Sequence, residues 1–387
     1  MKVLITGAYG FVGTNLSAHL DGRGVEVWAL DVEGTLTETQ KPQSVYKKRF
    51  RWEELGKIQW DEVDAVIHLA GKAHDTRNAS SPQSYFDINV GLTEKIVSSL
   101  VQYCESALVG KPEDKGQRTK VGIGSTNELM QCRTHALPKF ILFSSVKAVA
   151  DRVEGALTED AVPDPKTPYG QSKLEAEKVV RSSFVQYCES ALVSEEVDKG
   201  RRRDCGTGTT TELTNSRTNE LFYYILRPCM IHGPGNKGNL NLLYGMVRRG
   251  IPWPLGGFEN RRSFASIGNV CAVVDGLIKG DVPSGIYQVA DDEALSTNEL
   301  VGLMSDVMGR RARVWRIPAG LMRATARLGD VLHLPLNSER LKKLTESYIV
   351  SNNKLKAALG WKSMPVRAQD GLRFTFESFT LKNSRGS

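Results

Sequence analysis

A glycine-rich turn near the start of the chain constrains the fold more than any other feature. The turn Thr6–Gly13 (TGAYGFVG) follows the apolar run Lys2–Ile5, which is typical of a buried strand, and precedes a helical pattern. In such a unit Gly7 would form the tight turn, Gly10 would let a pyrophosphate approach the backbone, and Gly13 would let the helix pack on the strand. The phosphates would then bind the free N–H groups of that helix. An ordinary glycine-rich turn is the alternative, and the strand–turn–helix context favours a dinucleotide site.

Apolar runs of strand length alternate with helical patterns over the first 230 residues. Strands are predicted over 25–30, 45–51, 64–71, 140–145 and 223–226, and helices over 81–100 and 168–180. This alternation predicts an α/β fold with a doubly wound parallel sheet of the Rossmann type. We therefore predict a dinucleotide-binding domain over residues 1–230 and a smaller C-terminal lobe, mainly for substrate, over residues 231–387.

Residues that follow the predicted strands are candidates for ligand contact, because ligands bind beyond the carboxyl ends of strands in such sheets. Asp31 follows the second strand. A carboxylate there would bind the adenosine ribose and favour NAD over NADP, although it could also simply begin a loop. Ala70 and Gly71 end the fourth strand, and their small size would let a cofactor lie close. His68 lies inside the same apolar run, so we expect a core histidine rather than a catalytic one.

Tyr169 and Lys173 stand four residues apart on a predicted helix and so share one face. An ammonium beside a phenol favours the phenolate, which predicts a lowered pKa for Tyr169 and proton exchange with a sugar hydroxyl or ketone. Ser145 ends the fifth strand and could hydrogen-bond the reacting oxygen. The Tyr/Lys spacing alone is also typical of a surface pair, but its order after the glycine-rich turn and a Ser-Ser strand end makes the combination specific.

With these motifs the chain resembles the extended short-chain dehydrogenases/reductases, in particular the NAD-dependent epimerase/dehydratase group that acts on nucleotide sugars. The segments that carry the resemblance are Thr6–Gly13, His68–Gly71, Asn89, Ser144–Ser145, Tyr169–Lys173, Arg227–Pro228, Gly233–Gly235, Arg262–Ser263 and Asn269. The resemblance implies that Ser145, Tyr169 and Lys173 are catalytic.

The resemblance also implies two binding sets and no metal. The expected cofactor is NAD, with NADP possible, bound by Gly7, Gly10, Phe11, Val12, Gly13, Asp31, Leu69, Ala70, Gly71, Asn89, Tyr169, Lys173 and Pro228. The expected substrate is a UDP-sugar, bound by Lys147, Asn236, Asn239 and Arg262. An arginine suits the diphosphate, because it pairs with phosphate in a bidentate way.

The chain departs from the family pattern around the expected sugar. Ala148–Ala150 replaces a frequent Val-Tyr-Gly run, His232 stands where a tyrosine often precedes Gly-Pro-Gly, and Lys147 is unusual. The sequence therefore leaves open a UDP-hexose or N-acetylhexosamine 4-epimerase and, alternatively, an NAD(P)H-dependent reductase of a UDP-4-keto-6-deoxy-N-acetylhexosamine. A non-catalytic dinucleotide-sensing protein is a second alternative, usually marked by loss of the Tyr or Lys, and both are present here.

Two segments do not fit the alternation. Residues 101–134 and 185–218 are copies that share 20 of 34 residues at a fixed offset, and both begin with VQYCESALV. Each lies between a helix and the next strand, and each is too polar to form its own core. We interpret them as duplicated surface-loop insertions whose first residues prolong the preceding helices; a paired docking module is the alternative.

Composition excludes several classes of protein. No apolar run is long enough to span a bilayer, and the six cysteines lack metal or redox spacing, so we expect a cytoplasmic protein with reduced thiols. Residues 301–387 hold 16 Lys and Arg against 6 Asp and Glu. That excess could meet an acidic ligand, a membrane surface or nucleic acid, but a solvated basic face is favoured, and no nucleic-acid motif accompanies it. We also expect a homodimer.

Overall fold

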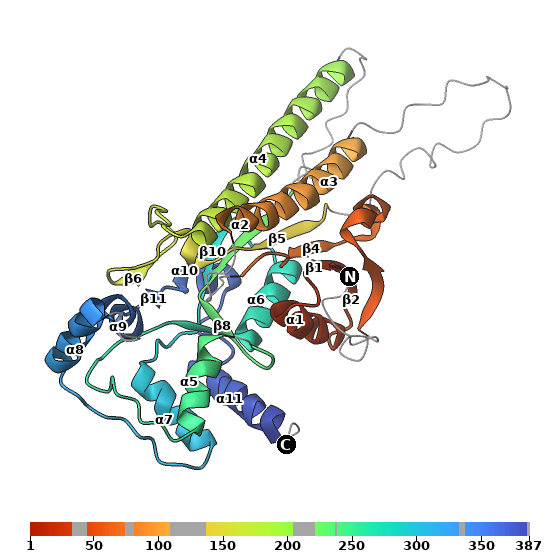
Figure 1. The fold of residues 1–387 in the computed structure, drawn as a ribbon. Helices are drawn as coiled ribbons and strands as arrows, with labels where there is room; N and C mark the ends of the chain where they lie inside the picture. Colours follow the sequence, from red (N-terminus) through yellow and green to blue (C-terminus); the bar gives the residue numbers. More distant parts are fainter. Residues whose placement is uncertain are drawn as a thin grey trace, which may run out of the picture.

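Seven parallel strands form the central sheet of the computed structural model (Figure 1), in the order β10-β7-β5-β4-β1-β2-β3. Every neighbouring pair is parallel, which confirms the predicted doubly wound sheet. The strands are β1 (Lys2–Thr6), β2 (Glu26–Leu30), β3 (Tyr46–Phe50), β4 (Ala65–His68), β5 (Lys139–Phe143), β7 (Tyr223–Pro228) and β10 (Gly285–Val289). The structure describes residues 1–32, 45–73, 81–108, 137–203, 221–236, 238–332 and 337–384.

Alternate residues of the strands face two separate cores. In β1, Val3 and Ile5 pack into one core and Leu4 into the other, because successive side chains of a strand point to opposite faces. Two helices cover each face of the sheet, so the first strand is buried on both sides. The helices are α1 (Phe11–Asp21) and α6 (Ile267–Lys279) on one face, and α3 (Gly91–Leu108) and α4 (Pro168–Arg203) on the other.

A third core lies outside the sheet, in the C-terminal part of the chain. It contains Leu240, Leu300, Met322, Leu341 and Phe376, one from each of five helices. The strand β10 and the helix α6 also come from this part of the chain but belong to the sheet layers. The five helices are α5 (Asn239–Arg248), α7 (Thr297–Val307), α8 (Ala319–Leu332), α9 (Ser338–Thr345) and α11 (Ala368–Ser384).

Short elements connect the sheet to this third core. Two parallel pairs, β6 with β11 and β8 with β9, join segments far apart in the sequence. These short strands are β6 (Ala156–Leu157), β8 (Met230–His232), β9 (Phe264–Ser266) and β11 (Ile349–Val350). The remaining described elements are the helices α2 (Pro82–Asn89) and α10 (Asn353–Leu359) and the 3-10 turns η2 (Trp52–Lys57), η3 (Trp60–Glu62) and η4 (Val146–Ala148).

The helix predicted over residues 81–100 is two helices. Ser81 caps α2 by accepting a hydrogen bond from the Ser84 N–H group, and Pro82 begins the helix. The break falls between Asn89 and Gly91. Glycine is a weak helix former, which explains a boundary at this point.

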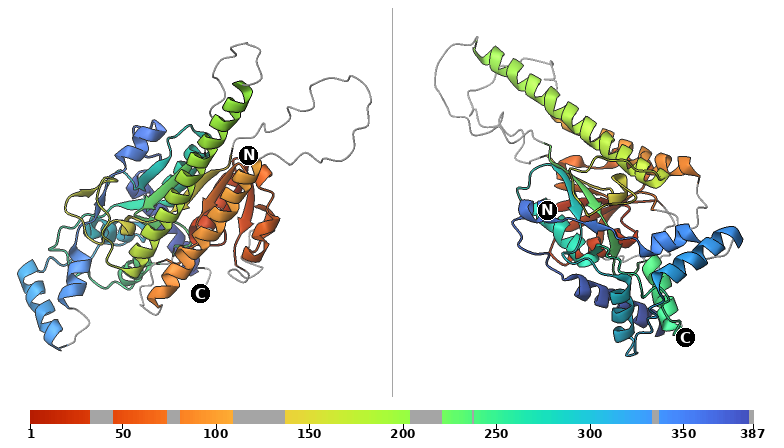
Figure 2. Two further views of the ribbon diagram at one scale, coloured as in Figure 1. Left: turned by 90° about the horizontal axis from the view of Figure 1, so that it is seen from above. Right: turned by 90° about the vertical axis from the view of Figure 1, so that its left-hand side faces the viewer.

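The helices α3 and α4 lie side by side and extend beyond the edge of the sheet (Figures 1 and 2). The first eight residues of one duplicated segment, 101–108, prolong α3, and residues 185–203 of the other prolong α4. The remainders, 109–134 and 204–218, lie outside the described residues. Among the described helices, none combines the length and apolar character needed to cross a membrane.

Candidate active site

The turn between β1 and α1 accepts only glycine at its two ends. Gly7 has φ +66°, and a Cβ there would lie 2.7 Å from the backbone nitrogen of Ala70. A Cβ on Gly13 would lie 2.5 Å from the Gly7 carbonyl oxygen. Gly10 caps α1 without a side chain, so the first N–H groups of the helix face the space above the turn, as in a phosphate cradle. Phe11 and Val12 follow as the first residues of α1.

Asp31 lies at the carboxyl end of β2, beside this turn. Its carboxylate accepts hydrogen bonds from the Tyr9 and Val32 N–H groups, each at 2.8 Å. Burial raises the pKa of Asp31, and the two N–H bonds oppose that shift. The carboxylate is therefore held in place where a ribose would lie in a dinucleotide fold.

The end of β4 forms the opposite wall of the cradle. The Thr6 hydroxyl accepts a hydrogen bond from the Ala70 N–H group at 3.1 Å. A Cβ on Gly71 would lie 2.8 Å from Asn89 Oδ1 and 3.1 Å from Lys173 Nζ, so a side chain there would displace one or both of these groups. Leu69 precedes these residues, and Pro228 ends β7 at the same edge of the sheet.

Asn89 ties this wall to α4. Its Oδ1 accepts from the Lys72 N–H group at 2.7 Å, and its Nδ2 donates to Ser172 Oγ at 2.9 Å. Asn89 is buried, so these bonds fix the loop after β4 against the helix that carries Tyr169.

His68 is a core residue, as the sequence indicated. Its ring nitrogens contact the Thr6 and Thr93 hydroxyls at 2.7 and 3.0 Å. Burial, with a smaller contribution from the Lys173 charge, lowers the pKa of His68 to about 3. The imidazole is therefore neutral near physiological pH.

Ser145, Tyr169 and Lys173 come together at the carboxyl end of β5. The Ser145 hydroxyl lies close enough to the Tyr169 phenol to act on its pKa, and Lys173 Nζ donates to the Phe143 carbonyl at 3.0 Å. The ring of Tyr85 contacts the ring of Tyr169 edge-on, with centroids 6.2 Å apart. The structure thus brings together all three side chains that the sequence assigned to catalysis.

The pKa of Tyr169 differs from the sequence-based expectation. Burial raises the pKa of the phenol, and the Ser145 hydroxyl lowers it only in part. Burial also lowers the pKa of Lys173 to about 8, although the Glu177 carboxylate acts in the other direction. Desolvation is the largest cause of both pKa shifts, because a buried site disfavours each charged form, and the expected lowering of the Tyr169 pKa by Lys173 is not found.

A buried ion pair holds α4 against the sheet. Glu177 accepts two hydrogen bonds from Arg227, at 2.9 and 2.6 Å, and a third from the Ser144 hydroxyl at 2.5 Å. The side chains of the pair are 2% and 3% exposed. Sequence reasoning did not assign a role to Glu177, although Tyr169, Lys173 and Glu177 follow the four-residue spacing of one helix face.

Two of the expected substrate-binding residues lie close together. Lys147 Nζ donates to the Asp151 carbonyl at 2.9 Å and lies 4.2 Å from the ring centre of Tyr348. Arg262 Nε donates to the Glu346 carbonyl at 3.2 Å. Burial lowers the pKa of both cations, and the Arg262 charge contributes to the shift of Lys147.

The other two, Asn236 and Asn239, belong to the loop between β8 and α5. The Asn236 carbonyl accepts from Asn241 Nδ2 at 2.7 Å, and Asn239 begins α5 with its side chain exposed. Asn15 Nδ2 of α1 donates to the Pro234 carbonyl at 3.2 Å, which places this loop beside the glycine-rich turn.

The fold and these side chains define a class of protein, the short-chain dehydrogenase/reductase type of dinucleotide enzyme. A glycine cradle, an acid at the end of β2 and a Ser–Tyr–Lys set all meet at the carboxyl edge of one parallel sheet. The sequence model of the NAD dependent epimerase/dehydratase family matches residues 3–194. The chain belongs to this family. It is therefore an enzyme, and the prediction of NAD as its cofactor is confirmed.

Relatives along the whole chain agree with this assignment. The UDP-glucose 4-epimerase of Vibrio cholerae is 24% identical, over 99% of this chain and 97% of the relative. A second relative is the N-acetyl-α-D-glucosaminyl-diphospho-ditrans,octacis-undecaprenol 4-epimerase of Escherichia coli O157:H7. It is 23% identical, over 82% of this chain and 75% of the relative. The structure of the Thermus thermophilus UDP-glucose 4-epimerase in complex with NAD is similar with a TM-score of 0.64 and 20% identity, over 98% and 99% of the two chains.

Proposed function

We propose that this chain is a 4-epimerase of a UDP-linked hexose or N-acetylhexosamine. The observation that carries the proposal is the meeting of Ser145, Tyr169 and Lys173 at the same sheet edge as the glycine cradle. Two relatives that align with nearly the whole chain are UDP-glucose 4-epimerases, which supports the choice of substrate class and reaction.

Each side chain has a role in this proposal. Tyr169 takes the proton from the sugar O4 and later returns it, and Ser145 orients that oxygen by a hydrogen bond. Lys173, as the ammonium, favours the phenolate form of Tyr169. The cradle of Gly7, Gly10 and Gly13 with Asp31 would hold NAD, which when bound supplies two-electron redox chemistry at the sugar C4.

The substrate side is assigned mainly to the C-terminal lobe, with Lys147 contributed by the 3-10 turn η4 after β5. Arg262 is assigned to the diphosphate, because a guanidinium matches two phosphate oxygens at once. Lys147 lies next to it and two residues beyond Ser145, so it is assigned to the sugar. Asn236 and Asn239 complete the set. The proposal includes a homodimer in the cytoplasm and a substrate lobe within residues 231–387.

The reductase of a UDP-4-keto-6-deoxy-N-acetylhexosamine is the second candidate, because the same three catalytic side chains would serve it. An epimerase regenerates its cofactor in each cycle, whereas a reductase consumes NAD(P)H. Purified enzyme incubated with UDP-glucose, UDP-N-acetylglucosamine or a UDP-4-keto-6-deoxy-N-acetylhexosamine, with and without added NADPH, separates the two. Formation of the C4 epimer without added reductant supports the epimerase, and turnover that requires NADPH and a keto sugar supports the reductase.

The role of Tyr169 is tested by the variant Tyr169→Phe, which removes the proton-transferring oxygen and keeps the ring. We expect loss of turnover with NAD binding retained. Tyr223→Phe, on β7, is the control and should keep full activity. Activity of Tyr169→Phe within tenfold of wild type, a barrier change below about 1.4 kcal/mol, would contradict the assignment.

A further inference from the structure

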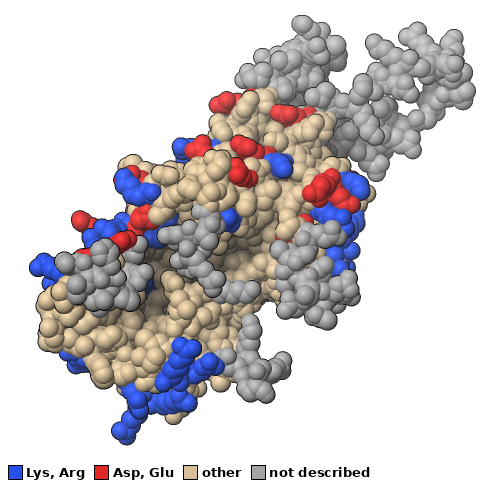
Figure 3. Space-filling view, in the orientation of Figure 1, with Lys and Arg blue, Asp and Glu red and all other residues tan. Residues whose placement is uncertain are grey.

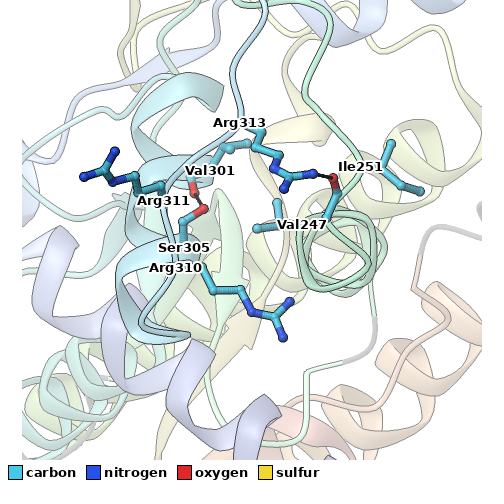
Figure 4. Close-up of a pocket in the computed structure, with 8 residues that line it drawn as sticks. Val247, Ile251, Val301, Ser305, Arg310, Arg311 and Arg313 are labelled. Carbon is cyan, nitrogen blue, oxygen red and sulfur yellow. Dashed lines mark hydrogen bonds between the residues drawn. The ribbon is translucent and has the colours of Figure 1, made fainter.

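The C-terminal lobe carries a second cationic site that shares no residue with the catalytic centre. A pocket of about 380 Å³ opens between the end of α5 and the segment after α7 (Figure 4). Its apolar wall comes from Val247, Ile251 and Val301. Its cationic wall comes from Arg310, Arg311 and Arg313.

Hydrogen bonds fix this arginine segment along α5. Arg310 Nη1 donates to the Arg248 carbonyl at 2.8 Å, and Arg313 Nη1 donates to the Gly250 carbonyl at 3.3 Å. Figure 4 shows both side chains directed toward the end of α5, whereas Arg311 points to the opposite side. Each of the two bonded guanidinium groups retains further N–H donors, because it has five.

Two stretches of the sequence, which include the pocket segments and most of α8, are rich in arginine. Residues 308–328 contain six arginines and no Asp or Glu, and residues 245–258 add two arginines and again no acid. All eight side chains are exposed. Figure 3 shows a group of Lys and Arg at the lower end of the molecule, around the ends of α5 and α7. The eight residues are Arg248, Arg249, Arg310, Arg311, Arg313, Arg316, Arg323 and Arg327.

Large apolar side chains are exposed on the same segments. Ile251, in the wall of the pocket, is 48% exposed, and Trp315, two residues beyond Arg313, is 58% exposed. The Trp315 N–H group donates to the Trp253 carbonyl at 2.8 Å, so this strand-like segment is pinned beside the residues after α5. We name Arg248, Arg249, Ile251, Arg310, Arg311, Arg313 and Trp315 the arginine–apolar face.

We propose that the arginine–apolar face docks the enzyme on an anionic membrane surface. Arginine beside tryptophan and aliphatic side chains is the composition of interfacial sites, in which the cations meet lipid phosphates and the apolar groups enter the headgroup region. Nucleic acid is the weaker occupant, because the face carries one exposed aromatic ring, Trp315, and its other exposed apolar side chain, Ile251, does not stack on bases. The proposal concerns attachment only and is independent of which sugar the catalytic site accepts.

The test is sedimentation of the purified full-length enzyme with phosphatidylcholine vesicles that contain or lack phosphatidylglycerol. We expect binding only to vesicles with the anionic lipid, and loss of binding as salt increases. The double variant Arg249→Glu/Arg311→Glu reverses two charges without touching the bonds to α5, and should lower the partition coefficient roughly tenfold or more. Trp315→Ser should also lower it, and both variants should keep wild-type epimerase or reductase activity.

A matched control has the same charge change elsewhere. Lys95→Glu/Arg181→Glu, on the exposed sides of α3 and α4, should bind vesicles like wild type. Equal loss in the control variant would show nonspecific attraction and overturn the proposal. So would binding to neutral vesicles alone, no vesicle binding at all, displacement by inorganic phosphate at equal phosphate concentration, or a preference for an oligonucleotide over anionic vesicles.

Discussion

Lys173 is the residue whose ionisation should limit the enzyme at high pH. Its pKa is lowered to about 8 by burial, and its charged form is the one that favours the Tyr169 phenolate. We expect kcat/KM to fall as the pH rises through about 8. Lys173→Arg keeps the positive charge at higher pH, so its residual activity should lack this fall.

The lowered pKa of Lys173 should raise stability over the pH range in which it lowers activity. Measuring stability therefore provides a control for the activity prediction. The folded pKa of Lys173 lies below its ordinary value of 10.5, so the unfolded chain binds more protons between about pH 8 and 10.5. This residue therefore adds stability as the pH rises through that window. Thermal unfolding measured over the same range should show no loss attributable to Lys173; unfolding that parallels the activity loss would refute the explanation.

Asp31 should set the preference between the two nicotinamide cofactors. A carboxylate beside the ribose repels the 2′-phosphate of NADP, so NAD should bind more tightly, and Asp31→Ser should narrow the difference. Arg23 does not offset this charge, because it pairs with Asp275 at 2.7 Å. A second basic residue in this part of the sequence, Lys41, could also offset the charge of Asp31, but it lies outside the described residues. Dissociation constants for both cofactors test the prediction, with Asp21→Ser as the control, and tighter NADP binding by wild type would contradict it.

At the scale of elements, the placement of α4 depends on one buried ion pair. Replacing Glu177 by alanine leaves Arg227 buried without its partner, which should cost about 3–5 kcal/mol of unfolding free energy. Glu175→Ala removes an exposed pair with Lys178 on the same helix and should cost less than about 1 kcal/mol. Chemical denaturation of both variants tests this. Similar values for the two would mean that the buried pair does not stabilise the helix position.

The sequence predicts the strands and the cradle but not the contacts between distant segments. Apolar periodicity and glycine spacing predicted six of the strands, a parallel sheet and the cradle, because these follow from local patterns and from the alternation of strands with helices. The contacts of Arg262 could not be predicted that way. They join β9 and its flanks to Glu346 and Tyr348, some 84 residues later, and depend on how the chain returns. Similarly, the raised pKa of Tyr169 reflects burial, which spacing alone does not give.

At the scale of the molecule, the parts of the duplicated segments beyond α3 and α4 should be dispensable for catalysis, whereas their first residues, such as Cys104 and Tyr187, are buried in the core. Residue 185 follows Tyr169 by 16 positions along α4, about 24 Å of helix, and α3 and α4 leave the sheet side by side (Figure 2). We expect a variant with residues 109–134 and 204–218 replaced by short Gly/Ser links to keep kcat and KM, since loop length costs little free energy. A folded variant without activity, or with an altered oligomeric state, would reveal a role for the segments.

The packing of α6 on α1 determines when the fold is completed during synthesis. The helix α1 packs beside α6, a helix made some 250 residues later, and the edge strand β10 follows α6 in the sequence. A nascent chain that has released only its first five strands therefore holds α1 without this later neighbour. Long separations of this kind slow folding and prolong exposure of apolar surface. Premature termination before residue 267 should accordingly yield an aggregating chain rather than a smaller enzyme.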